Sequence, residues 1–198
     1  MGNHIVCLVW SIFYGGIWLY LMSFDLVFSI WLAEIEVLET FFSFISGRVF
    51  SFSLFGIFAL FMLYQKRHKD LLFVFLALIF GDLIGAQLKD LIQEPRPCFG
   101  NFEVLSQLNI IEQPCGSRLT GMPSNHALNF FLFTTVFYLL TRQKVLTAAL
   151  FLIATAVALS RVFLIKHLLS QVIIGAALGI ILGITFYNIY KRIRWQKV

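Results

Sequence analysis

Long apolar runs separated by short polar connections dominate the chain. Each run is roughly 17 to 21 residues long, the length with which an α-helix crosses a hydrocarbon core of about 30 Å. The pattern therefore predicts an all-α integral membrane protein, a single domain over residues 1–198 built as a bundle of six transmembrane helices. The predicted spans are Ile5–Phe24, Phe44–Tyr64, Leu71–Leu88, Ser124–Leu140, Val145–Ile165 and Val172–Tyr190.

Three places qualify this pattern. Arg48 interrupts the start of the second run, where an arginine near a helix end can extend its guanidinium to the membrane surface. After the first run, Trp31–Glu39 mixes glutamates with apolar residues, which predicts a short amphipathic helix at the interface. The N-terminus lacks a basic start and its apolar run is long enough to stay in the bilayer, so we expect no cleavable signal.

Composition and charge agree with a membrane protein. Hydrophobic residues make up 60% of the chain and charged residues 13%, and the mean hydropathy is +0.88. The net charge of +5 could indicate nucleic acid, but the basic residues gather in short connections, which is typical of loops facing anionic lipid. We therefore expect a bilayer and a lipid as partners, no nucleic acid, and no obligatory protein partner.

The basic patches also predict sidedness. Lysines and arginines cluster in residues 65–70, 141–144 and 191–198, which fall on one side of a six-span bundle. The positive-inside rule makes that side cytoplasmic and places both termini there. The long polar segment 89–123 then faces the exterior.

Ionisable residues converge at the outer ends of the predicted spans. Lys89 closes the third span, Arg96 follows it, and His126 opens the fourth. Arg161 lies near the outer end of the fifth span, and His167 lies in the turn before the sixth. Three segments far apart in sequence thus bring two histidines and three cations to one level of the membrane, which predicts a site for an anion.

Each of these residues also has a purely structural interpretation. Lys89 could be a snorkelling anchor, and Ser124 could cap the fourth helix. A single histidine near an interface is more often a neutral hydrogen-bonded group, whereas Arg161 in an apolar helix needs a partner or an anionic ligand. Taken together, the structural interpretations require five coincidences, so the site is the better interpretation.

Three motifs within residues 89–171 resemble those of the type 2 phosphatidic acid phosphatase superfamily. That superfamily includes bacterial lipid A and undecaprenyl pyrophosphate phosphatases, glucose-6-phosphatase and soluble vanadium haloperoxidases. The motifs are Lys89-x6-Arg96-Pro97, Pro123-Ser124-Asn125-His126 and Ser160-Arg161-x5-His167.

The resemblance implies a phosphate site built from side chains. Lys89, Arg96 and Arg161 would supply fixed positive charge for the phosphoryl oxygens. Ser124 Oγ and the backbone N–H of Asn125, which stands where many members have glycine, would add donors at a helix N-terminus. No metal-binding carboxylate cluster is evident, so we expect no metal and no other cofactor.

The same resemblance assigns the chemistry to two histidines. His167 would attack phosphorus and become phosphohistidine, and His126 would protonate the leaving oxygen and then activate water. Gln171 stands where many members have an aspartate that orients the nucleophile. Glucose-6-phosphatases resemble this chain in having glutamine at that position. A glutamine carbonyl can hold the imidazole tautomer but supplies no charge to stabilise the imidazolium.

Several other residues have more than one interpretation. Asp82 lies on the same helical face as Lys89, and a structural partner for a neighbouring helix or a site cation is preferred over a direct catalytic role by two to one. Gly175, Gly179 and Gly183 predict close helix packing. Cys98 and Cys115 could form a disulfide if exported, or could be two unrelated thiols.

The predicted function is therefore an enzyme of the inner (plasma) membrane that removes phosphate from a lipid headgroup at the periplasmic or outer face. Lipid A 1-phosphate and polyprenyl pyrophosphate are preferred on the short chain length, with phosphatidate and phosphatidylglycerol phosphate also open. The alternative is a non-catalytic membrane protein that binds lipid phosphate with an inherited site. A haloperoxidase is disfavoured by the six spans, and a transporter by the absence of a midplane ion pathway.

Overall fold

A computed structural model describes residues 24–113, 115 and 119–195 of the chain. All regular secondary structure in these residues is helical, as the sequence predicts. The first predicted span lies outside the described residues except for Phe24. The elements are α2 (Phe24–Ala33), the 3₁₀ helix η2 (Glu36–Leu38), α3 (Glu39–Ile45), α4 (Arg48–Tyr64), α5 (His68–Ile92), α6 (Pro97–Gly100), α7 (Phe102–Gln107), α8 (Asn125–Thr141), α9 (Lys144–Phe163) and α10 (Leu169–Trp195).

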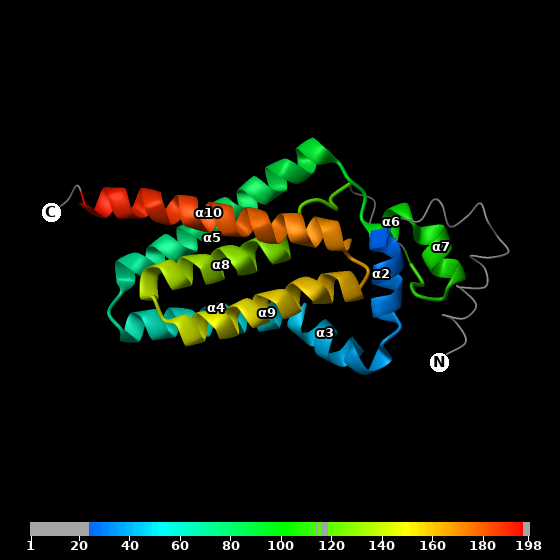
Figure 1. Ribbon diagram of the computed structural model, residues 1–198, viewed down its shortest axis with the longest axis horizontal. Helices are drawn as coiled ribbons and strands as arrows, with labels where there is room; N and C mark the ends of the chain where they lie inside the picture. Colours follow the sequence, from blue (N-terminus) through cyan, green and yellow to red (C-terminus); the bar gives the residue numbers. More distant parts are fainter. Residues whose placement is uncertain (1–23, 114, 116–118, 196–198) are drawn as a thin grey trace.

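Helix α8 forms the centre of the bundle, with α10 and α9 on either side of it in Figure 1. It packs against α10, α9 and α5. Leu128, Leu132, Phe133 and Phe137 on α8 are all almost completely buried. A helix that is hydrophobic on every side suits a position away from water, and the contacts with α5, α9 and α10 bury it inside the bundle.

Glycines on two neighbouring helices allow α8 to be approached closely. A Cβ added to Gly175 of α10 would lie 2.6 Å from the carbonyl oxygen of Ser124, and one added to Gly85 of α5 would lie 2.6 Å from Asn125 Oδ1. Real Cβ atoms do not tolerate such contacts. The packing interpretation of the glycine stripe on α10 is thus confirmed, and the same contacts hold the first residues of α8 between α5 and α10.

The number of membrane spans is the main difference between expectation and structure. Among the described residues, three stretches are long and apolar enough to cross a membrane: His68–Gln107, Lys144–Phe163 and Leu169–Ile193. There is a fourth candidate span if α3 and α4, which meet at a bend of 53°, together form a single span. The central helix α8 has 17 residues, just under the length of a typical span. Six spans therefore stay a prediction.

The second predicted span is bent where the sequence places Arg48. Helix α3 ends at Ile45, Gly47 adopts an extended conformation, and α4 begins at Arg48. The expected continuous helix over Phe44–Tyr64 is therefore wrong, because the extended Gly47 breaks the helical hydrogen-bond series.

The predicted interfacial helix over Trp31–Glu39 is likewise divided. Helix α2 ends at Ala33, and η2 and α3 follow it. In Figure 1, α2 runs across the end of the bundle beside α6. Its apolar side chains Leu26 and Ile30 pack in a cluster with Leu105 and Ile165, so burial against this end of the protein determines where the helix lies.

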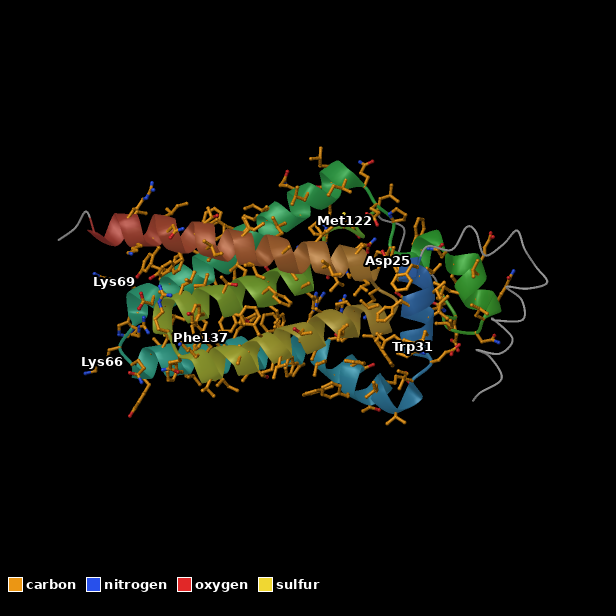
Figure 2. The ribbon with its side chains drawn as sticks, viewed as in Figure 1. Asp25, Trp31, Lys66, Lys69, Met122 and Phe137 are labelled. Atoms are coloured by element: carbon orange, nitrogen blue, oxygen red, sulfur yellow. A yellow bond between two sulfur atoms is a disulfide. The ribbon has the colours of Figure 1, made fainter. Side chains whose placement is uncertain are left out.

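The basic connections lie together at the opposite end. Figure 2 shows Lys66 and Lys69 at that end, whereas Trp31 and Met122 lie near the other. Arg67 ties the connection before α5 to the last turn of α8, because its guanidinium contacts Asp70 at 2.7 Å and donates to the Leu140 carbonyl at 3.1 Å. The end that carries α2, α6 and α7 is therefore the one that holds the predicted site.

Candidate active site

Residues from all three motifs line one cavity of about 500 Å³. Its charged walls come from α4, α5, the N-terminal side of α6 and α9, and its histidines come from the start of α8 and the turn before α10. Of the predicted site residues, the cavity is lined by Lys89, Arg96, Asn125, His126, Arg161 and His167. Ser124 and Gln171 are fully buried beside it.

Two carbonyl oxygens hold the imidazole of His167. Its Nδ1 lies 2.8 Å from the Gly121 carbonyl oxygen and 3.2 Å from Gln171 Oε1. Both oxygens only accept hydrogen bonds, so Nδ1 carries the proton and Nε2 has the free lone pair. The predicted contact with Gln171 is present, but the Gly121 carbonyl, which the sequence did not indicate, is the nearer acceptor.

Gln171 also connects His167 to a carboxylate. Its Nε2 donates to Glu94 Oε1 at 2.6 Å and to the Pro95 carbonyl at 3.3 Å. Its Oε1 accepts a further bond from the backbone N–H of Leu168 at 3.2 Å. The Gln171 amide thus links the His167 imidazole to the Glu94 carboxylate.

The loop that carries Gly121 is positioned by the segment before Arg96. The backbone N–H of Gly121 donates to the Glu94 carbonyl at 2.7 Å. A Cβ at Gly121 would lie 2.5 Å from the Pro95 carbonyl oxygen and 2.7 Å from Gln171 Nε2. Only glycine fits between these groups. Gly121 therefore connects the segment before Arg96, through its N–H, to His167 of the third motif, through its carbonyl oxygen.

Several buried polar groups at the site have no hydrogen-bond partner among the described residues. They include Arg96 Nε, Arg161 Nε and Ser124 Oγ. Ser124 precedes α8 without making a side-chain capping bond, so the capping interpretation is not observed. Buried donors are almost always satisfied in proteins, and an anion bound in the cavity would satisfy these.

Asp82 has a structural role toward a neighbouring helix. Its Oδ1 accepts hydrogen bonds from Asn125 Nδ2 at 2.8 Å and Asn129 Nδ2 at 3.1 Å, both on α8. The preferred interpretation of this aspartate is thus supported. The Asn125 side chain is thus turned toward Asp82 on α5.

Burial and positive charge keep His167 neutral. Loss of hydration, followed by repulsion from Arg161, Arg96 and Lys89, lowers its pKa to about 3, and the hydrogen bond to Gly121 offsets part of this. Lys166 beside it also has a lowered pKa, chiefly through burial. A neutral imidazole with a free Nε2 is the form that can attack phosphorus.

The described residues lack a metal-binding cluster, and the two cysteines among them form a bridge. Among the residues that the structure describes, no group of three or more His, Cys, Asp or Glu side chains could hold a metal ion. Cys98 and Cys115 form a disulfide with their Cα atoms 5.4 Å apart. The bridge joins the start of α6, two residues after Arg96, to the loop that leads to Gly121.

Comparison with known proteins gives one family for this fold and site. A family model described as "PAP2 superfamily" matches residues 70–195. Dolichyldiphosphatase 1 of Dictyostelium discoideum is 32% identical over 139 residues, covering 65% of this chain and 56% of that protein. Lipid A 4'-phosphatase of Porphyromonas gingivalis is 28% identical over 148 residues, covering 70% and 61%. The chain spans about half the length of the curated relatives it matches.

Solved structures show the same helical fold. A transmembrane PAP2-type phosphatidylglycerolphosphate phosphatase from Bacillus subtilis superposes with a TM-score of 0.67 at 22% identity, covering 85% of each chain. Aquifex aeolicus LpxE superposes with a TM-score of 0.61 at 21% identity, covering 84% of this chain and 96% of that one.

Proposed function

Because the chain belongs to the PAP2 superfamily, we propose that it is a membrane phosphatase that removes a phosphate group from a lipid headgroup through a phosphohistidine intermediate. One observation carries this proposal: a neutral, buried His167 shares a cavity with His126 and the cations Lys89, Arg96 and Arg161. That arrangement suits a reaction in which a nucleophile meets a highly charged electrophile.

The cations and the helix start would bind the phosphoryl group. Negative charge spreads over three equatorial oxygens in phosphoryl transfer, and Lys89, Arg96 and Arg161 would stabilise that charge. Ser124 Oγ, which has no partner among the described residues, and the Asn125 backbone N–H would supply further donors. Side chains thereby do the work that metal ions do in many phosphatases, so we propose that no metal or other cofactor is needed.

The two histidines would divide the chemistry. His167 Nε2 forms a bond to phosphorus as the bond to the leaving oxygen breaks, and His126 gives its proton to that oxygen. His126 then takes a proton from water as the water oxygen attacks phosphorus and the N–P bond breaks. Inorganic phosphate leaves, and both histidines return to their starting states.

Orientation in the membrane is part of the proposal. The site end would face the periplasm or exterior, with α2 at the interface, six spans, and both termini in the cytoplasm. Clustering of the basic connections at the opposite end supports this arrangement. The disulfide between Cys98 and Cys115 supports it too, because disulfides persist in oxidising compartments.

The preferred substrates are a polyprenyl diphosphate and a lipid A phosphate. The names of two relatives, dolichyldiphosphatase 1 and lipid A 4'-phosphatase, support these two classes. The second relative is named for the 4'-phosphate, so both phosphate positions of lipid A belong in the test rather than the 1-phosphate alone. We place the protein in the inner (plasma) membrane.

Phosphate release and covalent trapping test the proposal directly. Purified protein is given polyprenyl diphosphate, lipid A, phosphatidate and phosphatidylglycerol phosphate, and released phosphate is measured. A radiolabelled substrate should leave label on the wild-type protein and none on His167→Ala. Label that persists in His167→Ala would overturn the nucleophile assignment, and failure to hydrolyse any of these lipids would favour the non-catalytic lipid-phosphate-binding alternative.

A further inference from the structure

A fourth cation lines the cavity from outside the three motifs. Arg48 is the first residue of α4, and it lies before the part of the chain that the family model matches, residues 70–195. Its side chain is exposed, and it borders the same cavity as the motif histidines and cations. The phosphoryl-binding roles described above do not use it.

A hydrogen bond ties the start of α4 to the motif cations. Arg161 Nη1 donates to Ser46 Oγ in the turn between α3 and α4. Arg48 is two residues further along, and two residues of chain reach at most about 7 Å. The bond therefore holds the start of α4 against α9, and Arg48 and Arg161 line the same cavity.

The cavity-lining residues of α4 change from charged to aromatic along the helix. Arg48, Ser51, Phe52 and Phe55 are spaced i, i+3, i+4 and i+7, so they share one face. Phe52 is 74% exposed, and Phe55 packs against Phe130 with ring centroids 5.5 Å apart. The helix runs from the site end toward the Lys66 end, so this face leads from a cation to a hydrophobic wall inside the membrane.

Charge indicates what lies between the motif cations and that wall. Three cations already face the single phosphoryl group under attack, and Asp82 is the one carboxylate among the described residues that line the cavity. Asp82 is bonded to Asn125 and Asn129 on α8, away from α4. Arg48 is thus a positive charge beyond the three that the motifs supply, at the start of the α4 face that continues to Phe52 and Phe55.

We propose that Arg48 binds the non-reacting phosphate of a lipid diphosphate, and that the substrate class is a polyprenyl diphosphate. The inference rests on the proposed function. His167 bonds to the terminal phosphorus, the bridging P–O bond breaks, and its electron pair stays on the departing lipid monophosphate, which takes the proton of His126. Arg48 pairs with the oxygens of that departing phosphate, whose negative charge grows as the bond breaks. The prenyl chain then follows Phe52 and Phe55.

The test compares two lipids that differ in one phosphate. A prenyl diphosphate and the monophosphate of the same prenyl alcohol are presented in the same detergent micelles, and kcat/KM is measured for each. Arg48→Ala should lower kcat/KM for the diphosphate by about 10- to 100-fold, the effect of losing a hydrogen bond to a charged group. The value for the monophosphate should change by less than about 3-fold. Arg48→Lys keeps the charge but loses paired bonding, so it should recover part of the difference.

Controls separate this role from simpler ones. Arg142→Ala removes an exposed arginine at the opposite end, where Arg142 ends α8, and should leave both kcat/KM values unchanged. Thermal unfolding of each variant shows that the fold is retained. Equal losses of kcat/KM on both lipids would make Arg48 a general membrane or headgroup contact and overturn the proposal. The absence of any loss on either lipid would also overturn it.

The wild-type protein distinguishes the two levels of inference. Hydrolysis of lipid monophosphates alone would overturn the diphosphate assignment and leave the proposed function standing. If the protein hydrolyses lipid A but neither prenyl lipid, the diphosphate assignment is likewise overturned and the proposed function stands. If no lipid is hydrolysed at all, both proposals are wrong.

Discussion

Replacing Gln171 by alanine tests how the nucleophile is held. Gln171 is fully buried and makes four hydrogen bonds, two through Oε1 and two through Nε2. Alanine removes the contact to His167 and the bond to Glu94, but it leaves the 2.8 Å bond between His167 Nδ1 and Gly121 intact. The imidazole would therefore keep its tautomer and lose one of its two positional constraints.

The expected sizes follow from the bonds that are lost. A neutral hydrogen bond contributes about 0.5–1.5 kcal/mol, and one to a charged partner such as Glu94 about 1.5–3 kcal/mol. Only the first acts directly on the imidazole, so kcat should fall by roughly 2- to 12-fold, since about 1.4 kcal/mol corresponds to tenfold. Both hydrogen bonds contribute to stability, so the free energy of unfolding should fall by about 2–4 kcal/mol.

Steady-state kinetics in detergent micelles, with thermal unfolding of the same samples, check this expectation. KM should stay within about twofold, because phosphate binding depends on Lys89, Arg96 and Arg161. Glu94→Gln is the matched variant, since it keeps the acceptor oxygen and removes only the charge, and its kcat should fall less than that of Gln171→Ala. Gln171→Asp supplies a carboxylate but places it on a shorter side chain beside Glu94. A wild-type kcat in Gln171→Ala would show that the Gly121 carbonyl alone orients His167.

Four further outcomes are expected. His126→Ala should lower kcat by about 100-fold, a typical general-acid contribution, and an unchanged rate in a phosphate-release assay would remove it from the mechanism. Activity should survive EDTA, and a strict requirement for added Mg²⁺ would overturn the side-chain phosphate site. Replacing Cys98 and Cys115 with serine should lower the free energy of unfolding by about 3 kcal/mol in the chain-entropy model, and non-reducing mass spectrometry that finds both thiols free would rule the bridge out. Because the pKa of His167 is about 3 when folded and about 6.5 when unfolded, the unfolded chain binds more protons in that window, so stability is present above pH 6.5 and is lost as the pH falls toward 3. Lowering the pH from 7 to 5 should therefore reduce the free energy of unfolding of the wild type by about 2 kcal/mol more than that of His167→Gln. An equal change in both proteins would contradict a neutral His167.

The helical class and the residues that gather at the site could both be predicted from the pattern of residues along the chain. Apolar runs of membrane length predict helices whatever their arrangement, because a backbone in hydrocarbon must satisfy its hydrogen bonds internally. Once helices are assumed, the positions of Lys89, His126 and Arg161 along them place these residues at one level. The close packing of α10 through its glycine stripe could also be predicted, since small residues four apart on one face favour a close helix contact.

The breaks in the helices, and the groups that hold His167, Gln171 and Arg161, depend on how the helices pack together. The bend at Gly47 and the division of the helix expected over Trp31–Glu39 depend on packing against the end of the bundle, which no local pattern records. Gly121 is 46 residues from His167, Glu94 is 77 from Gln171, and Ser46 is 115 from Arg161. Hydrophobic periodicity describes which face of a helix is buried, but a hydrogen bond between such distant residues exists only after the helices have docked. His167 could therefore be proposed as the nucleophile from its motif, whereas the Gly121 carbonyl that accepts its hydrogen bond could not be predicted.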